Sequence, residues 1–179
     1  MIKLDVVLSA LNQQGVLGPF IIGKVTENQK FSGFYSCDVS IDPAQTFDER
    51  SAQILRAMKG RLPKGSHFSA QWDEPSRSIG FAHTFAMETS ANEDDARRVL
   101  DIVHANGGSV SKTWSIKSGD TLTCSVMYVM RFERDLIGIF ASDAIMRMIA
   151  TNLAQFLVDC VDVSLLLLNE LPPPRVGKQ

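Results

Sequence analysis

The hydrophobic and polar positions of this chain follow two periods, one typical of β-strands and one typical of α-helices. Over residues 34–41 apolar and polar side chains alternate, which indicates a half-buried strand. The same alternation or a β-branched composition predicts further strands at residues 20–26, 67–73, 79–89, 109–116 and 121–133. Apolar side chains spaced by three and four positions predict helices at residues 4–13, 47–59, 91–105 and 142–168.

Two stretches of the chain repeat the same order of elements. Each contains a capping box, in which a Ser or Thr is followed by a Glu three residues later, and the boxes lie at residues 46–49 and 90–93. In both, a helix and a strand follow, and the strands carry Trp72 and Trp114 at matching positions. The pattern predicts an internal duplication of a β-α-β unit.

A β-α-β-β-α-β order is typical of the ferredoxin-like arrangement, an α+β fold with an antiparallel sheet and both helices on one face. The duplicated halves comprise approximately residues 34–88 and 79–133. At 179 residues, the chain has the usual size of one domain. We therefore expect a single domain over residues 1–171, followed by a solvated tail over residues 172–179.

The predicted sheet has one large-residue face and one small-residue face. Side chains such as Phe81 and Phe85 would pack on the helices, whereas Ala82 and Thr84 would lie on the other side. The helix at residues 142–168 carries a wide apolar stripe and would pack separately, as a lid on the small-residue face. A second copy of the protein is the alternative cover. Residues 161–168 also alternate as a strand does, although we favour helix.

Composition narrows the expected partners. The net charge is −2 and the isoelectric point is about 5.9, which argues against nonspecific nucleic-acid binding. Charged residues interrupt the helix at residues 142–168 too often for a membrane span. The cysteines are odd in number and far apart, and Asp5 interrupts the apolar start of the chain, so we expect reduced thiols and a cytoplasmic protein.

Three side chains are weak candidates for chemistry. His83 lies mid-strand between two phenylalanines, where a lowered pKa would suit a general base, although a neutral core histidine is the simpler interpretation. Asp38 and Arg131 project from the small-residue face, where they could orient a substrate or simply meet solvent. Cys37 and Cys124 share the face of His83, but no pair of ligands has the close spacing of a zinc site. We expect no metal and no cofactor.

The chain contains none of the common nucleotide-binding, serine-hydrolase or zinc-protease motifs. The leading hypothesis is therefore a non-enzymatic protein-interaction or assembly module that self-associates or joins a protein partner. The alternative is a small cofactor-independent enzyme or small-molecule sensor that uses the sheet face as its pocket. A third possibility is a protein that blocks one target.

Overall fold

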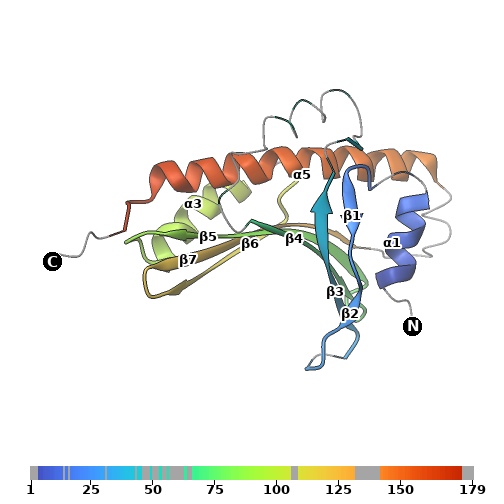
Figure 1. The fold of residues 1–179 in the computed structure, drawn as a ribbon, viewed down its shortest axis with the longest axis horizontal. Helices are drawn as coiled ribbons and strands as arrows, with labels where there is room; N and C mark the ends of the chain where they lie inside the picture. Colours follow the sequence, from blue (N-terminus) through green and yellow to red (C-terminus); the bar gives the residue numbers. More distant parts are fainter. Residues whose placement is uncertain are drawn as a thin grey trace.

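The computed structural model combines an antiparallel sheet of seven described strands with three helices whose full length is described, and is therefore an α+β fold (Figure 1). The part of the chain that the structure describes comprises residues 4–13, 15, 17–30, 32–42, 44–45, 49, 53, 56, 63, 66–105, 109–131 and 142–174. The predicted helix at residues 47–59 lies almost entirely outside these residues.

The strands form one open sheet in the order β1-β3-β4-β5-β7-β6, and β2 also pairs with β3. Their bounds are β1 Phe20–Ile22, β2 Thr26–Glu27, β3 Phe34–Ile41, β4 His67–Asp73, β5 Ser78–Glu88, β6 Lys112–Ser118 and β7 Thr121–Arg131. The segment expected as one strand over residues 20–26 is split at Gly23. A Cβ at Gly23 would lie 2.9 Å from the carbonyl oxygen of Asp38, so only glycine permits this close approach.

The described helices are α1 Leu4–Gln13, α3 Glu93–Ala105 and α5 Asp143–Glu170. Ser142 caps α5, because its side chain accepts a hydrogen bond from the backbone N–H of Ile145. Residues 161–168 continue this helix, so the favoured interpretation is confirmed and the strand alternative is wrong. By length and composition α5 could also cross a membrane. In this fold, however, one side of it packs on the sheet, as in the core helix of a globular domain.

The strand order differs from the ferredoxin-like order that the sequence predicts. β3 and β4 are antiparallel neighbours, whereas ferredoxin-like topology would make them parallel with another strand between them. Among strands that a described helix connects, β5 and β6 have that relation, because both are antiparallel to β7 and α3 lies between them in the chain. Moreover, Trp72 is fully buried on a central strand, while Trp114 is 38% exposed on the edge strand β6. The ferredoxin-like duplication is therefore not confirmed.

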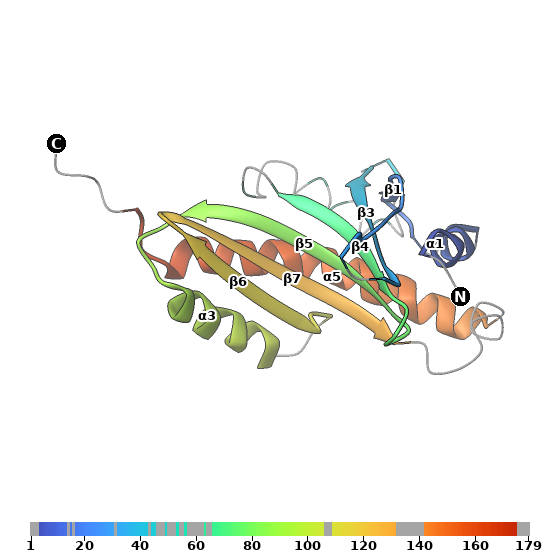
Figure 2. The ribbon, with the colours of Figure 1, turned by 90° about the horizontal axis from the view of Figure 1, so that it is seen from below.

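The helix α5 lies on the large-residue face of the sheet (Figures 1 and 2). The Phe156 ring lies 6.4 Å from that of Tyr128, and the Asn152 side chain donates to the Tyr128 hydroxyl at 3.0 Å. The prediction that this helix covers the small-residue face is wrong. The physical reason is that its apolar stripe buries more area against the large side chains of the core than against alanine, glycine and serine.

The start of the predicted tail is attached to the fold. The Thr89 hydroxyl donates to the carbonyl of Pro172, and the backbone N–H and hydroxyl of Ser90 both donate to the carbonyl of Pro173. Thr89 also accepts from the backbone N–H of Ala91 at 3.0 Å. These contacts hold the segment after α5 against the end of β5.

We expect Thr89→Val to lower the free energy of unfolding by about 1–2 kcal/mol, because it removes one hydrogen bond and leaves the Ala91 N–H without its acceptor. Urea denaturation measures the change. Thr121→Val, at an exposed strand end, is the matched control and should change the midpoint little. Equal midpoints for both variants would contradict this account of the attached tail.

Candidate functional site

The face of the sheet opposite α5 carries no described helix, and we call it the open face (Figure 2). It presents the even-numbered residues of β3, β5 and β6 and the odd-numbered residues of β4 and β7. Most of these side chains are small or polar, and many are half-buried. Two features stand out on it: a hollow around Gly80 and the exposed edge of β6.

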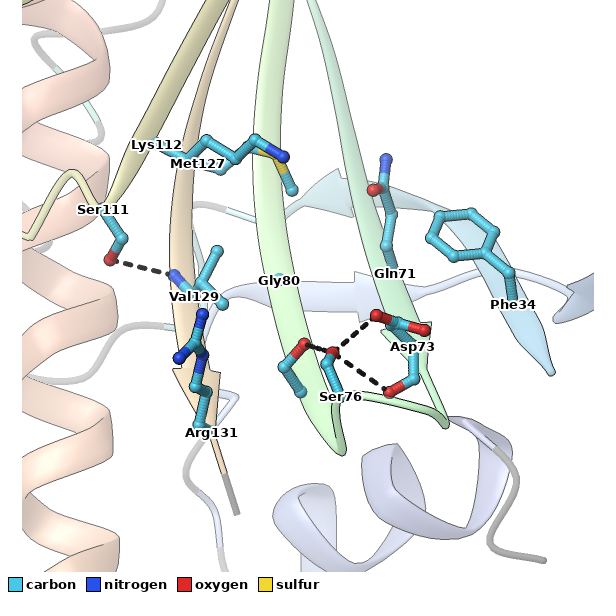
Figure 3. A pocket seen from close by; sticks show the side chains of 11 residues that line it. Phe34, Gln71, Asp73, Ser76, Gly80, Ser111, Lys112, Met127, Val129 and Arg131 are labelled. Carbon is cyan, nitrogen blue, oxygen red and sulfur yellow. Dashed lines mark hydrogen bonds between the residues drawn. The ribbon is translucent and has the colours of Figure 1, made fainter. Parts of the chain in front are cut away.

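The hollow has a volume of about 650 Å³, within the range of small-molecule sites, and is open to solvent. Its lining residues are Phe34, Gln71, Asp73, Ser76, Ser78, Gly80, Ser111, Lys112, Met127, Val129 and Arg131. Gly80 forms the floor, and the other side chains surround it (Figure 3). A Cβ on Gly80 would lie 2.9 Å from the terminal methyl of Met127, so the missing side chain lets Met127 pack against the floor of the hollow.

Charged groups stand on opposite sides of this hollow. Arg131 on β7 and Asp73 on β4 stand on opposite sides of the floor, and the Lys112 side chain from β6 lies at the Met127 end of the hollow (Figure 3). The Ser76 hydroxyl donates to Asp73 Oδ2 at 2.5 Å and lies 2.6 Å from the Ser78 hydroxyl. Asp73 is therefore oriented by the Ser76 hydroxyl, and no described ion pair joins it to either cation.

The strand β6 forms one edge of the sheet and, among the described strands, pairs only with β7. The two-residue turn after Ser118 begins with Gly119 at φ +59°, which makes Ser118 and Thr121 a hydrogen-bonded pair. Because hydrogen-bonded pairs alternate along the strand, the odd-numbered residues of β6 direct their N–H and C=O groups away from β7, toward the outer edge of the sheet. Accordingly, the N–H of Lys117 donates outward, to Glu93 Oε1 at 2.6 Å.

The open-face side of β6 is also apolar. Trp114 is 38% exposed and Ile116 is 57% exposed, and they are successive residues on this face of the strand. A seven-residue edge strand with exposed apolar side chains is a template for pairing with another strand. The opposite edge of the sheet is formed by β1 and β2, which are only three and two residues long.

His83 lies on the covered face, away from the hollow. It is fully buried, and its ring stacks between those of Phe68 at 4.6 Å and Phe85 at 5.2 Å. Neither ring nitrogen has a hydrogen-bond partner within the described structure. Burial lowers the pKa of His83 from 6.5 to about 4, with a smaller contribution from the charge of His67. The imidazole is therefore neutral at physiological pH.

The structure does not bring the three candidate residues together. Asp38 and Arg131 share the open face but belong to β3 and β7, and two strands lie between them. Asp38 instead lies 2.7 Å from Nε2 of His67, a residue that the sequence analysis did not consider. The side chains of β4 alternate between the two faces of the sheet, and this alternation places His67 on the face of Asp38. The sequence could have predicted the pair from that alternation. Both side chains are exposed, and no described hydroxyl hydrogen-bonds to His67.

The cysteines are confirmed as free and buried. Burial raises the pKa of all three thiols, that of Cys124 to about 12. Thiols with raised pKa values are poor nucleophiles and poor metal ligands, because both roles require the thiolate. Within the described residues, no group of three histidine, cysteine or acidic side chains could hold a metal ion.

No protein-family model, no curated protein and no solved structure matches this chain. Its function must be inferred from its own surface, in which the β6 edge and the hollow are the two distinctive features.

Proposed function

We propose that this protein is a self-associating module, in which two copies join by antiparallel pairing of their β6 strands. The observation that carries the proposal is the edge position of β6 among the described strands, which combines outward backbone groups with the exposed apolar side chains of Trp114 and Ile116. Edge-to-edge pairing satisfies such backbone groups and removes the apolar side chains from water.

The sequence of β6 is complementary to itself. In the register that pairs all seven residues of the strand, a two-fold axis passes beside Ser115. Because the odd-numbered residues face outward, Ser115 then pairs with Ser115 of the second copy through two hydrogen bonds. Trp114 lies opposite Ile116 of the second copy, at a non-hydrogen-bonded position where side chains come closest. Aromatic and β-branched side chains form favourable pairs at such positions.

The charges of β6 are compatible with this register. Lys112 would lie opposite Ser118 of the second copy, and Lys117 opposite Thr113, so no like charges face each other. The Glu93 carboxylate accepts a hydrogen bond from the outward N–H of Lys117. A second copy would have to displace this carboxylate at each end of the interface. The interface is small, and we expect a dissociation constant on the order of micromolar.

Sedimentation velocity over a wide range of protein concentrations tests the proposal. We expect the average mass to rise from one copy toward two, with a midpoint on the order of 1–100 µM. A mass that stays at 19.7 kDa up to millimolar concentration would refute self-association. A dimer that forms equally well after β6 is altered would refute this interface.

Removing the competing carboxylate should strengthen the interface. We expect Glu93→Ala to free the Lys117 N–H for the second copy and to lower the dissociation constant by about three- to tenfold. Sedimentation equilibrium measures the change. Asp101→Ala, at an exposed position later in α3, is the matched control for the lost charge. Weaker association of the Glu93 variant would show that this carboxylate supports the interface rather than competing with it.

A further inference from the structure

We propose that the hollow around Gly80 binds a small zwitterionic ligand, namely an amino acid or short peptide that carries both a free ammonium group and a free carboxylate. The arrangement that leads to this ligand class is the separation of charge across the hollow. Arg131 stands on one side of the floor and an oriented carboxylate, that of Asp73, stands on the other (Figure 3).

Arg131 would hold the ligand carboxylate. Lys112 pairs with Met127, four residues before Arg131 on β7, and Figure 3 shows its side chain reaching over Met127 toward the floor, where it adds positive charge at that end of the hollow. Among the described residues, neither cation makes an ion pair, so both heads are available to a ligand. A guanidinium group can bind a carboxylate through two parallel hydrogen bonds, which gives Arg131 the larger role.

The opposite side would hold the ligand ammonium. Asp73 is two strands away from Arg131 in the same cross-strand row, through Ser78 on β5. With strands about 4.8 Å apart, the two backbones are separated by about 10 Å, which leaves room for a ligand between the side chains. Ser76 holds Asp73 Oδ2, and no described residue hydrogen-bonds to Oδ1. Gln71, next to Asp73 on this face, adds an amide that can donate or accept.

The floor and the apolar lining set the size of the ligand. Gly80 on β5 lies between the strands of Arg131 and Asp73, Val129 lies beside Arg131 on β7, and Phe34 and Met127 offer apolar contact at the rim. A volume of about 650 Å³ can hold a dipeptide with a large apolar side chain. A zwitterion satisfies both charged sides at once, whereas a simple anion would leave Asp73 without a counter-charge and add repulsion.

The experiment titrates the intact protein with alanyl-phenylalanine and two blocked forms, monitored by backbone amide chemical shifts. The N-acetylated peptide lacks the ammonium, and the C-amidated peptide lacks the carboxylate. We expect each blocked form to bind about tenfold more weakly than the free dipeptide, because each loses one charge-assisted contact. The shifts should centre on Gly80 and Val129.

Substitutions assign each contact. Arg131→Gln should weaken binding of the free dipeptide about tenfold and leave binding of the C-amidated form unchanged. Asp73→Asn should also weaken binding of the free dipeptide about tenfold, and it should leave binding of the N-acetylated form unchanged. Arg147→Gln, at an exposed position on α5, is the matched control for lost positive charge. Should a variant fail to fold, the three peptides on the unaltered protein still decide the question.

Three results would overturn the proposal. They are no shifts at millimolar dipeptide, equal binding of all three peptides, or binding of the N-acetylated form as tight as that of the free dipeptide. The last result would indicate a simple anion site. Performing the titration well below the dissociation constant for self-association, as measured by sedimentation, keeps this test independent of the β6 interface.

Discussion

Replacing Ser115 with proline is expected to abolish self-association and to leave the fold intact. The N–H of Ser115 points away from β7, so proline removes no hydrogen bond within the sheet. In the proposed interface, the same change removes both central hydrogen bonds and places the proline ring against the second copy. We expect the dissociation constant to rise by at least about 100-fold, measured by sedimentation equilibrium.

Ser115→Thr is the matched control, because it changes the side chain and keeps the N–H. It should associate as the unaltered protein does. Circular dichroism and urea denaturation should place the stability of Ser115→Pro within about 1 kcal/mol of the parent protein. Retained dimerisation in a folded Ser115→Pro variant would contradict pairing through β6, while loss of dimerisation in both variants would show that side-chain size, not the N–H, is decisive.

The second large effect concerns His83 and acid stability. Its pKa is about 4 in the folded protein and 6.5 in the unfolded chain, so the unfolded chain binds the extra proton between these values. Neutral His83 therefore makes its full contribution to the free energy of unfolding above pH 6.5, and this contribution is lost as the pH falls toward 4. We expect the free energy of unfolding to drop by about 2 kcal/mol between pH 7 and pH 5 through this residue.

His83→Phe should remove that loss, because phenylalanine fills a similar space between Phe68 and Phe85 and does not titrate. At pH 7 the variant should also be more stable, by about 1 kcal/mol, since it eliminates two buried nitrogens that have no hydrogen-bond partner among the residues described. Urea denaturation at several pH values measures both effects. His104→Gln, an exposed histidine at the end of α3, is the control and should keep the acid sensitivity of the parent.

Local patterns predicted most of the described elements and failed on how they pair. Alternation located β3 through β7, and it placed Phe81 and Phe85 in the core, where both are fully buried. Strand order depends on which edge of the sheet the chain returns to after a helix, and side-chain periodicity carries no information about that choice. The matching positions of Trp72 and Trp114 therefore indicated a symmetry that the pairing lacks.

The candidate site was predictable only in part. The small-residue face and the outward direction of Asp38 and Arg131 follow from strand parity, and the structure agrees with both. A pocket on the sheet face was the alternative hypothesis, but the place and lining of the hollow were not predicted, because they depend on β4, β5, β7 and β6 lying side by side around Gly80. The cover of the small-residue face was wrongly assigned to α5, since an apolar stripe shows that a helix is buried but not against which surface.

In the proposed dimer, the open faces of the two copies determine the direction in which their hollows face. Antiparallel joining of two edge strands keeps the same face of both sheets on the same side, so both hollows would point in one direction. A bead or vesicle displaying peptides at high density could occupy both hollows together. Such bivalent capture raises the apparent affinity by about 10²- to 10⁴-fold without any additional contact.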